Sequence, residues 1–226
     1  MTIFKFTLLK GLRNPLTLVA NCFLPLALIF IRPLWANDAT IGARLMVMVM
    51  WGGAFLMSQS VLKDKEDGSI IRILAAPVTM LGYLTQSLLA FTVPLLVQTA
   101  LISAAGAVLY GWDAAFLFAL ALCYIAFTVS AVALGFAWSC LFKCRDNSSS
   151  IFITLITFGS FLSGIFLPLE LLPRPLQYVG AIIPSYWAVR GISALPEYDT
   201  AYWSALLAML LLAAIYLFYG GKRRLI

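Results

Sequence analysis

The chain has 226 residues, of which 63% are apolar and 11% are charged, and its formal net charge is +6. A soluble domain of this composition would leave too much hydrocarbon surface in water, so the composition excludes a soluble enzyme and predicts an all-α polytopic membrane protein. The basic residues gather at the ends of apolar segments and form no continuous stripe, so nucleic acid is not an expected partner.

Residues 1–14 predict an amphipathic helix that lies along the inner membrane surface. Apolar residues such as Phe4 and Leu8 are interleaved with Lys5, Lys10 and Arg13, which places apolar groups in lipid and basic groups toward headgroups. A frayed basic terminus is the alternative. A cleaved signal peptide is disfavoured because the apolar run that follows is bounded by Arg32 and precedes further spans.

Six apolar segments are long enough to cross a hydrocarbon core of about 30 Å. They are Pro15–Ile31, Leu45–Leu62, Leu84–Leu109, Ala114–Phe142, Ile151–Leu167 and Tyr202–Gly220. The segment Leu176–Leu195 is a doubtful seventh span, and the distribution of charge decides against it.

With a cytoplasmic N-terminus and six spans, most basic residues fall on the inner side, as the positive-inside rule requires. The inner side receives Lys5, Lys10, Arg13, Lys63, Lys65, Arg72, Lys143, Arg145, Lys222, Arg223 and Arg224, and the outer side receives Arg32, Arg44, Arg174 and Arg190. A seventh span would move the last three inner residues outside. The sequence therefore predicts a multi-pass protein with both termini cytoplasmic.

The sequence contains no recognisable catalytic motif and no expected set of metal ligands. It contains no His, which excludes metalloprotease motifs and Ser/His catalysis. The four cysteines, Cys22, Cys123, Cys140 and Cys144, fall within or at the inner end of predicted spans. Cys140 and Cys144 are placed one helical turn apart on the reducing side, so neither a disulfide nor a metal site is expected.

Small residues near the end of the fifth predicted span superficially resemble a membrane serine protease. They are Gly159, Ser160, Ser163 and Gly164. Small residues along one helix face allow backbones to approach closely in lipid, so we interpret them as packing residues.

Residues 63–79 form the one substantial cytoplasmic loop. Its charged run extends the second span into water, Gly68 breaks the helix, and Ser69 can cap a short apolar helix that ends at Pro77. That short helix either lies on lipid or docks on a cytosolic partner. The acidic residues before it, Glu66 and Asp67, oppose binding to anionic lipid and favour the partner.

The segment KEDGSIIRILAAPVTMLGYL resembles the region between the second and third spans of type-2 ABC (ABC-2) exporter permeases. In that family this short helix is the coupling helix that seats in a groove of the ATP-hydrolysing subunit. FKFTLLKGLRNPLTL resembles the family's N-terminal interface helix. FLSGIFLPLELLPRPLQYVGAIIPSYWAVRGI is similar to its fifth span and the short extracellular helices that follow. Near the start of the third span the chain departs from the family pattern at Met80, Gly82, Gln86 and Ser87.

The resemblance implies a half-transporter that consists of a single domain over residues 1–226. Its implied partners are two copies of an ABC ATPase subunit, a second permease subunit in a homodimer or related heterodimer, and membrane lipid. The chain has no GxxxxGK[ST] phosphate loop, so it binds no cofactor itself and ATP with Mg would be held by the partner ATPase. The implied location is the inner (plasma) membrane of a prokaryote.

Site residues follow from the resemblance and the predicted topology. Coupling to the ATPase is assigned to Glu66, Asp67, Gly68, Ser69, Ile70, Arg72, Leu74 and Pro77. The interface helix carries Lys10, Arg13, Asn14 and Pro15. An extracellular gate over 168–198, built of short helices that dip back into the outer leaflet, includes Pro168, Glu170, Leu172, Pro173, Pro184 and Tyr186. The pathway wall beneath it includes Phe161, Ser163, Gly164 and Phe166.

The cargo is constrained only by the scarcity of polar residues inside the predicted spans. Asn21, Gln59, Gln86, Gln98, Ser130 and Thr154 occur singly, and no buried ionisable group marks an ion path. An apolar pathway suits export of an amphipathic or lipid-linked cargo such as a drug, lipid, peptide or glycan. The alternatives are a passive channel, a scaffold subunit, or a specialised ABC complex such as a haem-handling one, although the absence of His disfavours direct haem binding.

Overall fold

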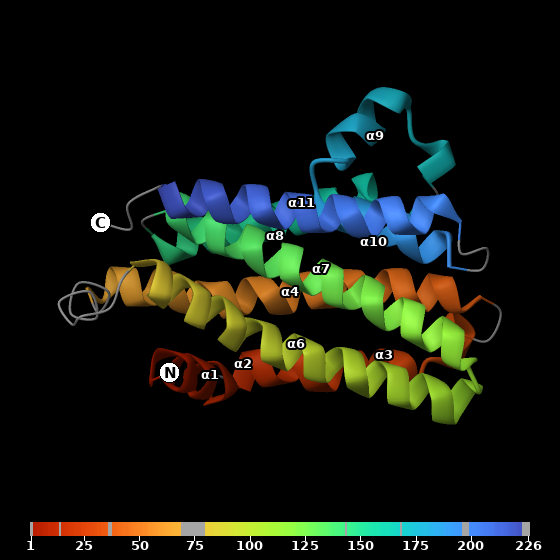
Figure 1. Ribbon diagram of the computed structural model, residues 1–226, viewed down its shortest axis with the longest axis horizontal. Helices are drawn as coiled ribbons and strands as arrows, with labels where there is room; N and C mark the ends of the chain where they lie inside the picture. The colour runs from red at the N-terminus through yellow and green to blue at the C-terminus, as the bar shows by residue number, and fades with distance from the viewer. Residues whose placement is uncertain are drawn as a thin grey trace.

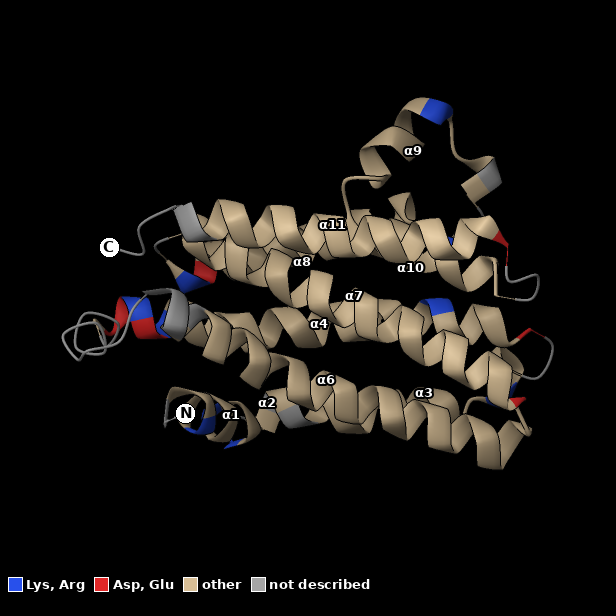
Figure 2. Cartoon of the chain, viewed as in Figure 1, with Lys and Arg blue, Asp and Glu red and all other residues tan. Residues whose placement is uncertain are grey.

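The computed structural model describes residues 2–13, 15–35, 38–68, 80–142, 144–167, 169–195 and 199–222. Within these residues there are helices and no strand, and the long helices run side by side as a bundle (Figure 1). Charged residues gather at the two ends of the bundle and leave most of its length uncharged (Figure 2). The molecule is an all-α membrane protein.

Four helices are long and apolar enough to cross a membrane, over residues 39–66, 85–110, 114–141 and 200–220. A shorter apolar helix covers Val19–Ile29. We call the end of the bundle where α4 stops and α6 starts the basal end. The opposite end, where α4 begins and α6 stops, is the apical end.

The N-terminal region forms a surface helix and a broken apolar helix. Helix α1 (Thr2–Arg13) is followed by α2 (Pro15–Leu18), a π-helical turn (Val19–Phe23), α3 (Leu24–Ile29) and a 3₁₀ turn (Arg32–Leu34). Pro25 lacks the N–H that would continue the regular ladder, which accounts for the π turn just before it. The first predicted span is thus helical as far as Ile29.

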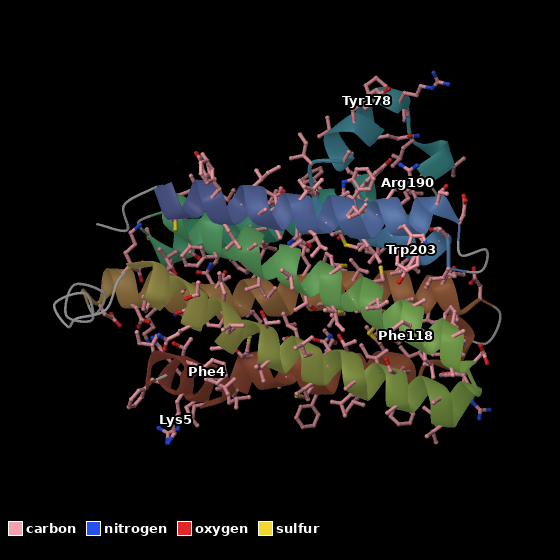
Figure 3. All side chains as sticks on the ribbon, in the orientation of Figure 1. Phe4, Lys5, Phe118, Tyr178, Arg190 and Trp203 are labelled. Atoms are coloured by element: carbon pink, nitrogen blue, oxygen red, sulfur yellow. The ribbon has the colours of Figure 1, made fainter. Side chains whose placement is uncertain are left out.

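Helix α1 is less exposed to lipid than the sequence predicted. Its backbone N–H at Phe4 donates to Gln86 Oε1 of α6 at 3.4 Å, and a Cβ at Gly11 would lie 3.4 Å from Met57 of α4. Lys5 points away from the bundle (Figure 3), and Phe6 is exposed. One side of α1 therefore packs on protein, because the bundle offers it an apolar surface.

Helix α4 (Ala39–Glu66) is the most buried of the long helices. It begins six residues before the predicted span, because Asp38 accepts a hydrogen bond from the Thr40 N–H at 2.8 Å and caps the helix. It ends where the charged run ends, and Gly68 then adopts φ +64°, a left-handed conformation that favours glycine.

Helices α6 (Met80–Tyr110) and α7 (Ala114–Leu141) pack on each other and on α4. Gly111 at φ +64° and the Asp113 N-cap make the turn between them. Helix α7 stops at Leu141, so Cys144 lies beyond the helix that carries Cys140, and the prediction that they sit one turn apart is wrong. Among the described residues no group of His, Cys, Asp and Glu is arranged to hold a metal.

Helix α8 (Arg145–Leu162) starts six residues before the predicted fifth span and ends five residues before its predicted end. Hydroxyls in this polar start bond back to carbonyls of the same helix, as Ser150 Oγ does to the Asp146 carbonyl at 3.1 Å. The early end is set by Gly164, which turns the chain at φ +81°. The prediction that helix continues to Leu167 is therefore wrong.

Between α8 and α11 (Thr200–Lys222) lie a 3₁₀ turn (Leu169–Leu171), α9 (Arg174–Gly180) and α10 (Pro184–Ser193). Helix α9 stands off the bundle as an arm (Figure 1). Helix α10 is mostly buried and contacts α11, α4 and α7. The turn between α9 and α10 lies against α11, since the Tyr216 hydroxyl donates to the Ile182 carbonyl at 2.5 Å on the surface of the bundle. Tyr216 lies 16 residues, or about 24 Å of helix, from Thr200 at the apical end.

Candidate transport surface and its two ends

One face of α4 is left open by its neighbours. Partly or fully exposed residues recur every three or four positions along it: Ile41, Arg44, Leu45, Met48, Gly52, Leu56 and Ser60. We call this set the α4 strip. From Ile41 to Ser60 it covers 19 residues, or about 28 Å of helix, which matches the thickness of a hydrocarbon core.

The α4 strip lies between α8 on one side and the N-terminal helices on the other. Toward α8, the rings of Phe55 and Phe152 stack with centroids 3.9 Å apart, and Trp51 meets Phe152 edge-on. Toward the N-terminal helices, a Cβ at Gly53 would lie 2.0 Å from Asn21 Oδ1, so a larger residue would displace the buried Asn21 side chain. Both flanks of the strip are therefore well packed.

Helix α8 carries a polar stripe on its exposed face. Asn147, Ser150, Thr154 and Thr157 recur at helical spacing, and the exposed ring of Phe161 continues the line. The threonine hydroxyls donate to the carbonyls four residues earlier, both at 3.0 Å. Each hydroxyl oxygen is thus held on the surface, where it can still accept a hydrogen bond from outside.

The opposite face of α8 is fixed on α4. Gln59 donates through Nε2 to Ser148 Oγ, and Ser149 Oγ donates to Gln59 Oε1, each at 3.4 Å. Gln59 is therefore part of a network, and the prediction that it occurs singly is wrong. A Cβ at Gly159 would lie 2.8 Å from the Trp51 ring, which supports the interpretation of this glycine as a packing residue.

At the basal end, the last turns of α4 contact several other elements. Lys10 of α1 pairs with Asp64. Lys65 Nζ donates to the Phe142 carbonyl after α7 at 3.2 Å, and the Arg145 N–H at the start of α8 donates to Glu66 Oε1 at 2.5 Å. A displacement of this end of α4 would therefore also displace the contacting parts of α1, α7 and α8.

We call Lys10, Asp64, Lys65, Glu66 and Arg145 the basal cluster, and Tyr83 links α6 to it through Asp64. The Tyr83 side chain is buried. Burial, and to a lesser degree the charge of Asp64, raise the pKa of Tyr83 above its ordinary value. The phenol therefore stays protonated and neutral at physiological pH.

A cavity of about 610 Å³ opens at the basal end of the α4 strip. Its walls combine apolar and basic side chains from α1, α4 and α8. They include Phe6, Leu9, Leu56, Met57, Lys10, Arg13, Lys63 and Arg145. An amphipathic molecule with an anionic group matches such a lining.

At the apical end, the predicted pathway wall is divided between a buried and an exposed part. Ser163 and Ser185 are fully buried and share a hydrogen bond of 2.5 Å between their hydroxyls. Phe161 and Phe166 are about half exposed, with ring centroids 5.1 Å apart. Ser163 thus joins α8 to α10, whereas the two phenylalanines face outward.

The remaining predicted site residues are placed as follows. Lys10 and Arg13 are exposed at the basal end, Pro15 begins α2, and Pro173 precedes α9. Pro184 and Tyr186 are buried at the start of α10, and Leu172 is half-buried. Asn14, Ser69, Ile70, Arg72, Leu74, Pro77 and Pro168, as well as the side chain of Glu170, lie outside the described residues.

The profile of the ABC-2 family transporter proteins matches residues 34–221 of this sequence. The chain belongs to the ABC-2 family. No curated protein sequence matches it significantly. The ABC-2 match runs from the end of the first apolar region to the last turn of α11, so it covers the α4 strip, the α8 stripe and both ends of the surface.

Membership of the ABC-2 family makes this chain a membrane transport subunit of an ABC transporter. Such subunits are typically non-catalytic, and they work with an ABC ATPase and often with another permease. Together with its apolar helices, the family identifies the chain as a multi-pass membrane protein.

Several features of the ABC-2 surface escaped sequence reasoning. The periodicity of Asn147, Ser150, Thr154 and Thr157 is visible in the sequence, but the polar residues were treated one by one. Arg44 was counted only as an outer charge, because nothing local shows which helix packs against it. The pairing of Lys10 with Asp64 joins residues 54 positions apart, so only the fold reveals it.

Proposed function

We propose that this ABC-2 chain is the permease subunit of an ATP-driven exporter, and that its cargo moves along the α4 strip and the α8 stripe. The observation that carries the proposal is the α8 stripe. A row of amide and hydroxyl groups gains nothing from facing acyl chains, and polar residues in membrane helices normally face a pathway or another helix. The cargo is an amphipathic or lipid-linked molecule, because the flanks of the stripe are apolar.

The proposed topology has six spans with the basal end in the cytoplasm. The spans are α2 with α3, then α4, α6, α7, α8 and α11. The basal end then carries Lys5, Lys10, Lys63, Lys65 and Arg145, in keeping with the positive-inside rule. The proposed location is the plasma membrane of a prokaryote, with both termini cytoplasmic.

The proposed assembly contains two permease subunits and two ATPase subunits. The α4 strip is open along about 28 Å of helix, so a second subunit, identical or related, would face it and enclose a path between them. The ATPase subunits would hold ATP and Mg.

Coupling is proposed to pass through the segment 69–79 and the basal cluster. In the ABC-2 exporter permeases that it resembles, the corresponding segment seats in a groove of the ATPase. Because Asp64, Lys65 and Glu66 contact α1, α7 and α8, movement of the segment would rotate or shift these helices together. The segment 168–198 at the apical end would act as the outer gate.

The test is copurification of the tagged chain in mild detergent, followed by ATPase assays of the complex in lipid. An ABC ATPase should accompany the chain, and cargo should stimulate ATP hydrolysis. A bulky substitution at Gly68, whose φ of +64° disfavours side chains, should leave the complex assembled but uncouple hydrolysis from transport. Absence of any ATPase under mild conditions would instead indicate a passive channel or a scaffold.

A further inference from the structure

Two arginine side chains line one cavity at the apical end of the bundle. Arg44 of α4 and Arg190 of α10 both border a space of about 600 Å³, together with Gln177, Tyr186 and Ser193. Figure 3 shows Arg190 at the foot of the α9 arm. This volume lies within the range of small-molecule binding sites.

The two guanidinium groups have no carboxylate partner among the described residues. The one ion pair of the described chain, Lys10 with Asp64, lies at the other end of the bundle. The Nε of Arg44 is buried and has no hydrogen-bond partner in the described part. Arg190 lies over the ring of Trp187, with Cζ 5.6 Å from the centroid. Among the described residues, the two positive charges are therefore left without an opposite charge.

The chemistry of the pair favours a phosphate group. A partly buried guanidinium such as that of Arg44 is costly without a partner, and two guanidinium groups on one cavity repel each other. An anion between them relieves both costs. The planar fork of arginine matches phosphate oxygens with two parallel hydrogen bonds.

The walls of the cavity are held in place by the protein itself. The Gln177 side chain donates through Nε2 to the carbonyls of Leu169 and Leu172 at 2.9 and 2.8 Å. Trp187 donates through Nε1 to the Ala181 carbonyl at 2.8 Å, which fixes the ring beneath Arg190. The cavity is therefore pre-formed around the two arginines.

A second, apolar cavity adjoins the first. It measures about 220 Å³ and is lined by Ile41, Ile165, Phe166 and Leu167. Arg44 and Gly164 border both cavities. The Arg44 side chain thus stands between a polar and an apolar compartment, which is the arrangement that an amphipathic ligand requires.

We propose that Arg44 and Arg190 bind the phosphate group of an anionic amphipath, with its headgroup in the larger cavity and its hydrocarbon chain over Phe166 and Leu167. Binding itself is independent of transport. The role of the site as a receiver of exported cargo, or of a lipid that supports the gate, rests on the proposed function.

The test measures binding of phosphatidylglycerol to the purified full-length chain in neutral detergent, by native mass spectrometry. Arg44→Gln and Arg190→Gln should each weaken binding at least tenfold. The matched control is Arg174→Gln, because Arg174 is an exposed arginine on the neighbouring helix α9 that does not line the cavity. It should change affinity less than twofold. Equal affinities for all three variants would overturn the proposal.

Two further arms identify the ligand chemistry. Uncharged diacylglycerol should bind at least tenfold more weakly than phosphatidylglycerol, and equal binding would overturn the role of the arginines. Inorganic phosphate should compete only at a concentration at least a hundredfold above that of the lipid. Competition at equal concentration would overturn the proposal that the ligand is an amphipath and leave a site for free anions.

The variant Glu170→Gln belongs in the series because Glu170 follows Leu169, a cavity residue. This variant should bind phosphatidylglycerol at least as tightly as the parent chain.

The design separates failure of this inference from failure of the proposed function. If Arg44→Gln does not fold, as judged by gel filtration and circular dichroism, the exposed Arg190 provides the deciding variant. Selective binding in a chain that recruits no ATPase would retain the site and reject the exporter. Cargo-stimulated ATPase activity with unselective binding would retain the exporter and reject the site.

Discussion

Helices α8 and α11 both expose one face, but the two faces differ in chemistry. Thr200 and Ser204 are exposed at the apical start of α11, but the exposed side chains from there through its middle turns are apolar, and they include Leu207, Leu210, Leu211 and Ile215. The exposed face of α8 interrupts its apolar residues with the stripe of Asn147, Ser150, Thr154 and Thr157. Exposure alone therefore does not identify a lipid face, whereas the type of exposed residue distinguishes a face for lipid from a face for cargo or a partner.

The largest effect is expected from separating α8 from the α4 strip. Gly159→Leu would put a Cβ within 2.8 Å of the Trp51 ring, and overpacking of this kind costs about 1–3 kcal/mol. Thermal unfolding in detergent should occur at a markedly lower temperature, and transport should be lost. Gly52→Ala is the control, because a Cβ at Gly52 meets no atom within 4 Å. Equal stability of the two variants would show that α8 does not pack on Trp51.

An intermediate effect is expected from exchanging the chemistry of the two open faces. Thr154→Leu combined with Thr157→Leu should leave folding intact but lower transport by at least about tenfold, the equivalent of ~1.4 kcal/mol on the barrier. Leu207→Thr combined with Leu211→Thr on α11 should instead lower stability and spare transport per folded molecule. Transport in proteoliposomes, normalised to folded protein, distinguishes the pairs. Equal transport by both would mean that the α8 stripe has no special role.

The smallest effect on stability is expected at the basal cluster. The side chains of Lys10 and Asp64 are 40% and 22% exposed, so solvent screens their pairing and Asp64→Asn should cost only about 0.5 kcal/mol. Coupling should suffer more than stability, because Asp64 links α1 to the end of α4. The ratio of ATP hydrolysed to cargo moved measures this. Restoration of the ratio by the exchange Lys10→Asp with Asp64→Lys would confirm that the pair itself is responsible.

The sequence was most informative where composition and order of motifs suffice. Apolar content predicted an all-α membrane protein, and the order of the N-terminal, loop and Gly159–Gly191 motifs indicated the ABC-2 family. Both conclusions are confirmed. They depend on long segments, in which local deviations average out.

The sequence was least informative where a single backbone angle decides the end of a helix, or where a contact between distant residues forms a site. Hydropathy ran the fifth span on to Leu167, but Gly164 at φ +81° ends the helix earlier. Hydropathy also excluded Asn147 and Ser150 from that span, although both lie in the first turns of α8. Arg44 of α4 and Arg190 of α10 line the same cavity. No local sequence pattern indicates that these two residues lie close together.

The hydrogen bond between Tyr216 and the Ile182 carbonyl ties the last helix, α11, to the turn between α9 and α10. Before the turn between α9 and α10 can move away from α11, the Tyr216 hydroxyl must release the Ile182 carbonyl, which lies well below the apical end. Under the proposed topology this surface bond faces acyl chains, where an unpaired backbone carbonyl costs about 1–3 kcal/mol. Under the proposed function, breaking this bond is part of the free energy that opening the outer gate requires. In that proposal, α11 contributes to the stability of the closed gate although it carries none of the residues assigned to the gate.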